Sequence, residues 1–389
     1  MGKIVEYLII FGLLITPILN IGEIVANYNL TFTQQSIETP IYIKLLKDFL
    51  FISLIIISFF NIFVKNKIRY NSKILILIFL TIISSLVSLL HQNVGTIISG
   101  FRWAFVFFLT LSFLNLDLKK IDNLQEKISK LLIILIYINL LLQFFQLLYF
   151  PVIHGKNFLG LNLRNTGFFS IPQTAAFFTM IVMWYIYVYY NNSFHKIVLL
   201  YFLSPISILL TASGTGLVAL FVFYLYLVYK KVRQKKITLL FSLFFIFFFF
   251  FSLDRLTGRE DIFDSIVIRI GILKEYIFEK QNNIFLSTNF GRGTNTSVLF
   301  GNLANYDNLG IIADSLINSM IINLGILGVL IFIILILSVF IKCRTSRVLI
   351  IIYSIFSITN IFFESYPMNL IFALNIAYFC KEKLDTVNY

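Results

Sequence analysis

The stretch SLINSMIINLGILGVLIFIILILSVFI, residues 315–341, runs without a charged side chain. A helix needs about 20 apolar residues to cross the roughly 30 Å hydrocarbon core of a bilayer, so this stretch predicts a transmembrane helix. Asp314 stands directly before it, Asn318 lies one turn in, and Gly325 and Gly328 follow. An acidic group at the mouth of an apolar helix requires an explanation, and the explanation depends on topology.

The rest of the chain repeats this apolar pattern. Of its 389 residues 59 % are hydrophobic and only 13 % are charged, and the mean hydropathy is +0.91. These values exclude a soluble globular domain and predict an all-α integral membrane protein of about twelve transmembrane helices. The predicted spans are 4–22, 45–64, 74–90, 97–116, 131–150, 173–190, 197–212, 216–229, 237–253, 315–341, 348–364 and 367–380.

The basic residues predict the orientation of these spans. Twenty of the 31 Lys and Arg residues fall on one side of the predicted bundle, which identifies that side as cytoplasmic. The first span lacks a small-residue cleavage site and is interpreted as a retained helix, so both termini are expected in the cytoplasm. The net charge of +13 is thus a topology signal and predicts no nucleic-acid partner. We expect one membrane domain over residues 1–389.

Two segments interrupt the bundle on its external side. The longer one, residues 254–314, is inserted between the ninth and tenth predicted helices, and the shorter one spans residues 151–172. Long loops in compact domains are usually functional. Within the longer loop, residues 258–280 carry apolar side chains at helical spacing and predict an amphipathic helix on the bundle or in the interface.

Metal chemistry has no sequence signal. Cys343 and Cys380 fall at predicted cytoplasmic helix ends, where a disulfide is not expected. The three His residues are far apart in sequence and form no metal-binding spacing with the cysteines. We therefore predict neither a metal site nor a cofactor.

Arginine is the basic residue that departs from the topology pattern. Six of the ten arginines are predicted to be external or membrane-embedded: Arg102, Arg164, Arg255, Arg259, Arg269 and Arg292. A guanidinium group binds phosphate through two parallel hydrogen bonds and keeps its charge when partly desolvated. Such a set suits a lipid-linked phosphate or pyrophosphate at headgroup depth.

Two of these arginines allow two interpretations each. Arg102 lies inside a predicted helix, where it either faces a cavity in the bundle or extends to the interface. Arg292 lies between two glycines in STNFGRGTNTS, residues 287–297. That segment forms either a turn whose backbone N–H groups face an anion or a simple surface turn.

Asp314 also has two compatible interpretations. It could cap the tenth helix by accepting backbone N–H groups of the first turn. Asn318 and Gly325 are expected on the same helix face as Asp314, and Gly325 and Gly328 are expected to let another helix approach closely. A carboxylate held in that way can act as a general base toward an attacking hydroxyl.

Three further features are weaker candidates. Glu364, near the external end of the eleventh predicted helix, could orient an arginine or a sugar. His154 in the shorter external segment is either a base or simply solvated. The small residues of TASGTGLVAL, residues 211–220, indicate helix packing or, as the second interpretation, substrate contact.

The arrangement of Asp314, Gly325 and Gly328, D-x(10)-G-x-x-G after a long external loop, resembles the superfamily of O-antigen polymerases (Wzy), O-antigen ligases and SEDS peptidoglycan polymerases. The order of Arg259 and Arg269 before GRGTNTS, residues 291–297, resembles the loop of the polymerases and ligases. In the ligases a His-Asn pair opens the motif, whereas Asp314-Ser315 stands here. The resemblance therefore favours a polymerase, and twelve helices fit Wzy better than SEDS.

This resemblance implies a metal-independent glycosyltransferase with a GT-C-like bundle in the bacterial inner membrane, its active site facing the periplasm. The growing glycan would leave undecaprenyl pyrophosphate for a hydroxyl of an incoming lipid-linked repeat. Asp314 would be the general base, the six arginines and Asn318 would bind substrate, and membrane lipids and a chain-length regulator protein would be partners. The alternatives are a ligase that transfers finished glycan to another acceptor and a flippase for lipid-linked oligosaccharides.

Overall fold

A computed structural model describes residues 2–20, 41–66, 68–116, 118, 123–149, 165–169, 171–231, 271, 274, 285–294, 315–343 and 346–382. Every regular element within these residues is helical. The elements are α1 (Gly2–Leu14), α3 (Ile41–Lys65), α4 (Ser72–Ser88), α5 (Val94–Asn115), α6 (Leu124–Tyr149), α7 (Pro172–Tyr189), α8 (Ser193–Val198), the π-helical turn η2 (Leu199–Leu203), α9 (Ser204–Thr211), α10 (Gly214–Lys231), α14 (Leu316–Lys342), α15 (Arg347–Ser357) and α16 (Met368–Glu382).

The helices are those of a multi-pass membrane protein. Five described stretches are long and apolar enough to cross a bilayer: Leu45–Lys65, Val94–Asn115, Leu124–Leu148, Phe194–Thr211 and Leu316–Lys342. Large apolar side chains on the outer faces of α3, α4, α6 and α14 are exposed, among them Phe49, Phe63, Phe79, Leu141 and Ile341. A soluble monomer rarely exposes so much apolar surface, whereas lipid chains would cover it. The predicted all-helical membrane protein is confirmed, and the number of spans stays a prediction.

The predicted spans differ from the helices in two places. The span 348–364 is too long, because α15 ends at Ser357 and turns follow up to residue 367. The span 197–212 corresponds to α8, η2 and α9, which follow one another with a π-helical turn in the middle. The span 237–253 lies outside the described residues.

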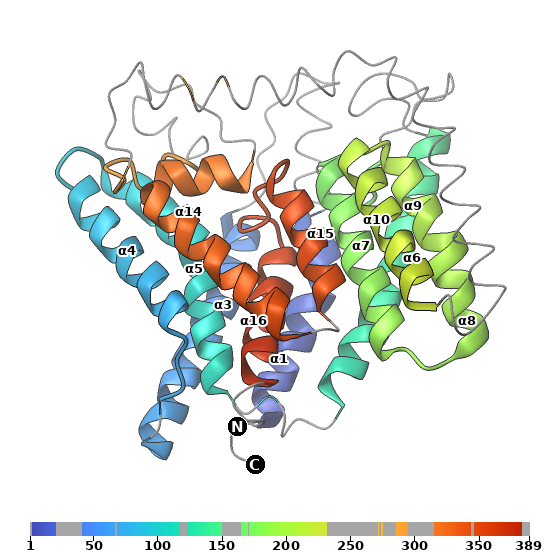
Figure 1. The fold of residues 1–389 in the computed structure, drawn as a ribbon, viewed down its shortest axis with the longest axis horizontal. Helices are drawn as coiled ribbons and strands as arrows, with labels where there is room; N and C mark the ends of the chain where they lie inside the picture. Colours follow the sequence, from blue (N-terminus) through green and yellow to red (C-terminus); the bar gives the residue numbers. More distant parts are fainter. Residues whose placement is uncertain are drawn as a thin grey trace.

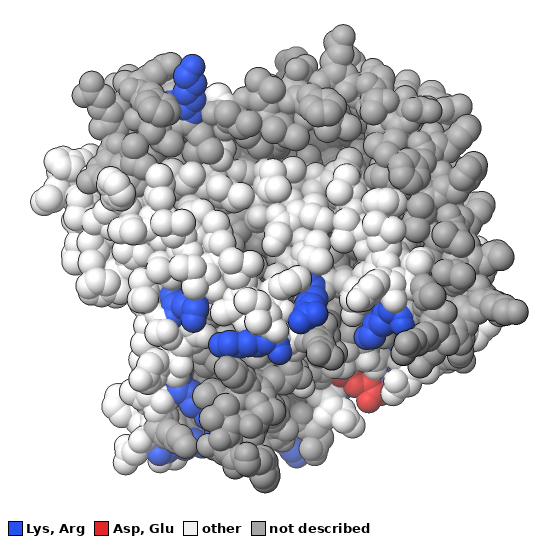
Figure 2. Space-filling model, in the orientation of Figure 1, with Lys and Arg blue, Asp and Glu red and all other residues white. Residues whose placement is uncertain are grey.

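Many basic side chains lie at one end of the bundle, which we call the basic end. Lys127 at the start of α6 pairs with Glu6 of α1 at 2.5 Å, Lys381 of α16 donates to the carbonyl oxygen of Leu116 after α5, and Arg347 of α15 donates to a carbonyl of α14. Figure 2 shows Lys and Arg gathered in the lower half of this face, where Figure 1 places the start of α1 and the end of α16. Whether this end faces the cytoplasm stays a prediction.

The helices form two groups that α15 connects. In Figure 1, α6 to α10 lie together on one side of the molecule, while α4, α5, α14 and α16 lie on the other. α15 contacts α7 and α10 in the first group and α14 in the second. The ring centroid of Tyr353 on α15 lies 5.6 Å from that of Phe177 on α7 and 4.8 Å from that of Phe372 on α16. These contacts bury the turns after α15, and Phe362 and Phe363 in them have no exposed surface.

α14 is not one straight helix. Gly325 has φ 78° and ψ −178°. This backbone conformation lies outside the helical region, and its positive φ favours glycine. Figure 1 shows the consequence: the first segment of α14 lies across the upper end of the bundle, and the second runs obliquely down it. The predicted stripe of Asp314, Asn318 and Gly325 along one helix face is therefore wrong, because the helix is broken at Gly325.

Gly328 has a local role as well. A Cβ atom at this position would overlap the Leu324 side chain of the same helix, which the break at Gly325 brings close. The three atoms nearest to such a Cβ all belong to Leu324. The expectation that Gly328 also admits a neighbouring helix stays a prediction.

Candidate functional site

The start of α14 is capped by Ser315. The Ser315 side chain accepts the backbone N–H of Asn318 at 3.1 Å, and Ser315 is 2 % exposed. Asp314, the predicted general base, lies outside the described residues. Since Ser315 already takes the N-cap position, capping is no longer needed to explain an acid at position 314.

Residues 285–294 form a turn that is packed against the first segment of α14. The Asn323 side-chain oxygen accepts the backbone N–H groups of Gly291 and Gly293 at 2.9 and 3.2 Å. Ser319 donates to the carbonyl oxygen of Gly293, and Ser287 donates to that of Ile322. The predicted turn at Arg292 is present, but the N–H groups on both sides of Arg292 bind an amide of the protein and do not face an anion.

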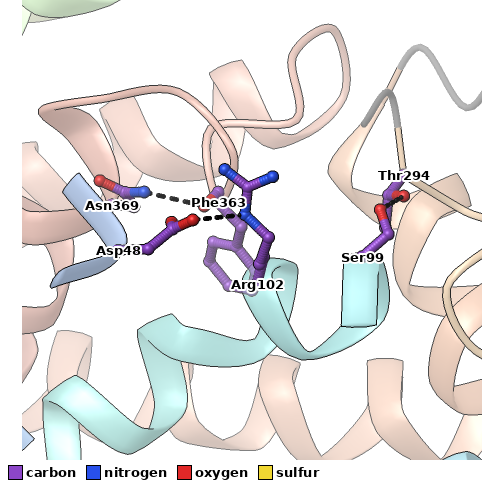
Figure 3. Close-up of polar contacts among 6 residues, drawn as sticks. All are labelled: Asp48, Ser99, Arg102, Thr294, Phe363 and Asn369. Atoms are coloured by element: carbon purple, nitrogen blue, oxygen red, sulfur yellow. Dashed lines mark hydrogen bonds and ion pairs between the residues drawn. The ribbon is translucent and has the colours of Figure 1, made fainter. Parts of the chain in front are cut away.

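The same turn is packed against α4 and α5. Thr294 and Ser99 of α5 share a hydrogen bond of 2.8 Å, as Figure 3 shows, and the backbone N–H of Phe290 donates to Ser88 of α4 at 2.9 Å. Gly100 permits this contact, because a Cβ atom there would lie 2.5 Å from the Phe290 ring. The turn is thus buried between three helices, and the interpretation as a simple surface turn is wrong.

A second non-helical stretch, residues 165–169, is held in the same manner. Gln146 of α6 donates to the Gly167 carbonyl and accepts the Gly167 N–H, both at 2.8 Å. Asn139 accepts the backbone N–H of Phe168 at 3.1 Å. Residues 165–169 end the shorter external segment, directly after Arg164. A stretch of each predicted external segment therefore contacts the bundle through backbone groups that side-chain amides satisfy, as buried irregular backbone requires.

Arg102 forms an ion pair inside the bundle. Its Nε lies 2.8 Å from Oδ2 of Asp48 on α3, with the side chains 15 % and 12 % exposed (Figure 3). Arg102 is eight residues after the start of α5, which is about 12 Å along the helix axis. Between the two interpretations of this residue, the structure supports the inward one: Arg102 faces a recess and does not extend away from the bundle.

The recess beside Arg102 is small, partly open and mixed in charge. Its volume is about 20 Å³, enough for one or two water molecules. It is lined by Lys47, Asp48, Phe51, Arg102, Trp103, Phe363, Glu364 and Asn369. Asn369 donates to the Phe363 carbonyl at 3.1 Å and so fixes the turn that carries Glu364 (Figure 3).

Trp103 is one of the residues that line this recess. Its side chain is fully buried, and among the described residues its indole N–H has no hydrogen-bond acceptor. Buried N–H groups in native proteins nearly always have a partner, so each exception indicates a water or a ligand group. The Trp103 N–H itself has almost no exposed surface, so it is not counted among the groups that an occupant of the recess can reach.

The predicted site residues divide into two sets. Arg102, Arg292 and Asn318 are described: Arg102 lines the recess, Arg292 is half-buried in the 285–294 turn, and Asn318 is buried in the first turn of α14. Asp314, Arg164, Arg255, Arg259, Arg269 and His154 lie outside the described residues, as does the predicted amphipathic helix apart from residues 271 and 274.

Glu364 lies near Arg102, as one interpretation of it requires, but in a turn and not on a helix. The packing interpretation of residues 211–220 agrees with Gly216, where a Cβ atom would lie 2.6 Å from Ala176 of α7.

Sequence reasoning missed Asp48 and Asn323. A signal for Asp48 existed, because an ionisable residue inside an apolar helix is rare and usually functional. However, the charged residues Lys47 and Asp48 stand side by side, which resembles the end of a helix near the membrane interface. Asn323 had no comparable signal, since its partners Gly291 and Gly293 are 32 and 30 residues away.

Comparisons of the chain with models of known protein families, with curated proteins and with solved structures gave no match. The interpretation of this end of the bundle therefore depends on its chemistry and on the motif resemblance.

Proposed function

We propose that this protein is a polymerase of lipid-linked oligosaccharide repeat units, of the type that builds O-antigen or a related surface polysaccharide. In the proposed reaction, the growing glycan leaves its undecaprenyl pyrophosphate carrier and is transferred to a hydroxyl of an incoming lipid-linked repeat. The enzyme would be a metal-independent glycosyltransferase of the bacterial inner membrane, with its active site on the periplasmic side.

One observation carries the proposal. The 285–294 turn binds both to α5, at Ser99, and to the first segment of α14, at Ser319 and Asn323. This turn of the predicted external loop, the Arg102 recess and the residue that follows Asp314 therefore belong to one end of the bundle, away from the basic end. A shared location is what a site that combines an acid with several arginines requires.

The break in α14 supports a site at this end as well. Broken helices in membrane proteins place polar backbone and side chains at a depth where a straight helix would offer only apolar surface. The first segment of α14, residues 316–324, carries Asn318, Ser319 and Asn323, whereas the second segment is almost entirely apolar. Irregular backbone at such depth is typical of membrane proteins that handle polar substrates.

The proposed chemistry needs two kinds of residue. Asp314 would take the proton from the attacking hydroxyl as a general base. Arginines of the external segments would stabilise the charge that grows on the pyrophosphate while the glycosidic bond breaks. Neither step needs a metal, because the guanidinium groups supply the positive charge.

A reconstitution experiment tests the proposal. Purified protein is incubated with lipid-linked repeat units, and the products are separated by length. A polymerase gives a ladder, a ligase gives one transferred product, and a flippase gives no change of length. Asp314→Asn should abolish the ladder, whereas Glu126→Gln, an equivalent change in an exposed pair at the basic end, should leave it unchanged. A ladder that survives Asp314→Asn would reject the general-base role.

A further inference from the structure

The recess beside Arg102 carries balanced charge. Lys47 and Arg102 contribute two positive charges to its lining, and Asp48 and Glu364 contribute two negative ones. A pyrophosphate group entering it would meet two carboxylates, and like charges at such short range repel strongly in a partly desolvated site. The recess is therefore a poor site for the leaving pyrophosphate, although Arg102 by itself would suit one.

The recess instead offers donors and acceptors side by side. Asp48 binds the Nε of Arg102, and Figure 3 shows the two terminal nitrogens of the guanidinium pointing away from Asp48. Asp48 and Glu364 supply negatively charged carboxylate oxygens, which accept hydrogen bonds. A hydroxyl group is both a donor and an acceptor, so it is the group that such a lining satisfies.

The size of the recess agrees with one such group. A volume of about 20 Å³ admits an occupant similar in size to water. A pyrophosphate or a whole sugar ring does not fit, whereas one hydroxyl or hydroxymethyl group of a ring held outside does. The aromatic side chains that complete the lining, Phe51, Trp103 and Phe363, are buried, so the recess has a rigid wall.

We propose that this recess binds a hydroxyl group of the glycan and that Asp48 and Glu364 select for it. The assignment deepens the proposed function and rests on it, because it names the part of the substrate that Arg102 contacts. Arg102 then recognises sugar, and the arginines of the external segments are left for the pyrophosphate. A site built to bind a hydroxyl rejects analogues that lack one, so the recess would also help to determine which repeat unit is extended.

Chemical footprinting of Arg102 tests the assignment. The full-length protein in lipid nanodiscs is treated with phenylglyoxal, which modifies arginine, and the modification of Arg102 is quantified by mass spectrometry. Three probes are added separately: lipid-linked glycan extracted from the cells that make the protein, free glycan released from it by mild acid, and undecaprenyl pyrophosphate without glycan. Both glycan-bearing probes should protect Arg102, and the bare lipid pyrophosphate should not. Arg347 at the basic end is the internal control and should react equally in all samples.

Two results would overturn the assignment: equal protection of Arg102 by undecaprenyl pyrophosphate without glycan, or no protection by the glycan-bearing probes. Failure of the polymerase proposal would give a different experimental result. In that case the length ladder is missing while glycan still protects Arg102.

A variant gives a second readout that a purely structural role would not change. Glu364→Gln replaces the charged acceptor of the hydroxyl by a neutral amide and should raise KM for the repeat unit about tenfold, the loss expected for one hydrogen bond to a charged group. The value of kcat should change much less. An unchanged KM in this variant, with the protein folded, would contradict hydroxyl binding in the recess.

Discussion

Asn323 accepts the backbone N–H of Gly291 at 2.9 Å, and through this bond the 285–294 turn within the predicted external loop is attached to the broken helix α14. The same amide oxygen binds the N–H of Gly293. One side chain therefore satisfies two backbone donors that lie outside regular secondary structure. The location of Arg292 in the fold therefore depends on Asn323, because this side chain holds the glycines on both sides of it.

Asn323→Ala should loosen the turn. It leaves two buried N–H groups without their acceptor, and each unsatisfied group costs roughly 1–3 kcal/mol. We expect a lower midpoint in thermal unfolding of the purified protein and new protease cleavage within residues 285–294. Cleavage and unfolding like those of the unsubstituted protein would show that the bond to Asn323 is dispensable.

Gly325→Ala should strain the break in α14. A φ of 78° combined with ψ −178° is a conformation adopted almost only by glycine, and it costs an L-residue such as alanine on the order of 1–3 kcal/mol. The Gly325→Ala variant should therefore unfold at a lower temperature and polymerise glycan more slowly. Gly95→Ala is the matched control, because Gly95 is helical and a Cβ atom there meets only ordinary contacts. Equal stability of the two variants would mean that the break is not set by Gly325.

Arg102→Gln should destabilise the protein more than the double variant Arg102→Gln/Asp48→Asn. The single change leaves the Asp48 carboxylate without its cation in a poorly hydrated place, and losing one partner of a buried ion pair costs roughly 3 kcal/mol or more. The double variant removes both charges together. Thermal unfolding of the three proteins checks this order, and a double variant less stable than the single one would contradict it.

Arg269→Lys should remove most polymerising activity if Arg269 binds pyrophosphate through its fork. Lysine keeps the charge but cannot donate two parallel hydrogen bonds, so catalysis should fall by at least about tenfold. Arg347→Lys at the basic end is the control. Near-normal ladder formation by Arg269→Lys would count against pyrophosphate binding at this residue.

Removal of divalent metals should leave activity unchanged. The proposed mechanism uses guanidinium groups for the positive charge and Asp314 for the proton transfer. Ladder formation by purified protein should therefore persist in EDTA. Activity that is lost with EDTA and restored by added Mg²⁺ would require a different mechanism.

Much of the fold was predictable from sequence because membrane insertion imposes strong local rules. A helix must satisfy its own backbone in the hydrocarbon region, so apolar length alone reveals the helices. Breaks inside an apolar run are harder to predict. The run at 348–364 looked continuous, yet α15 ends at Ser357, because tertiary packing buries the following turns around Phe362.

The candidate site was likewise predictable from sequence only in part. The sequence by itself determined that this is a helical membrane protein, that Arg102 is an anomaly inside an apolar helix, and that Asp314 shortly precedes a helix whose first turns carry polar residues. Only the tertiary structure decided the partners, because Asp48 reaches Arg102 across 54 residues and Asn323 reaches Gly291 across 32. Local hydropathy measures how favourable it is for a segment to leave water. Which polar groups then satisfy one another depends on how the helices pack.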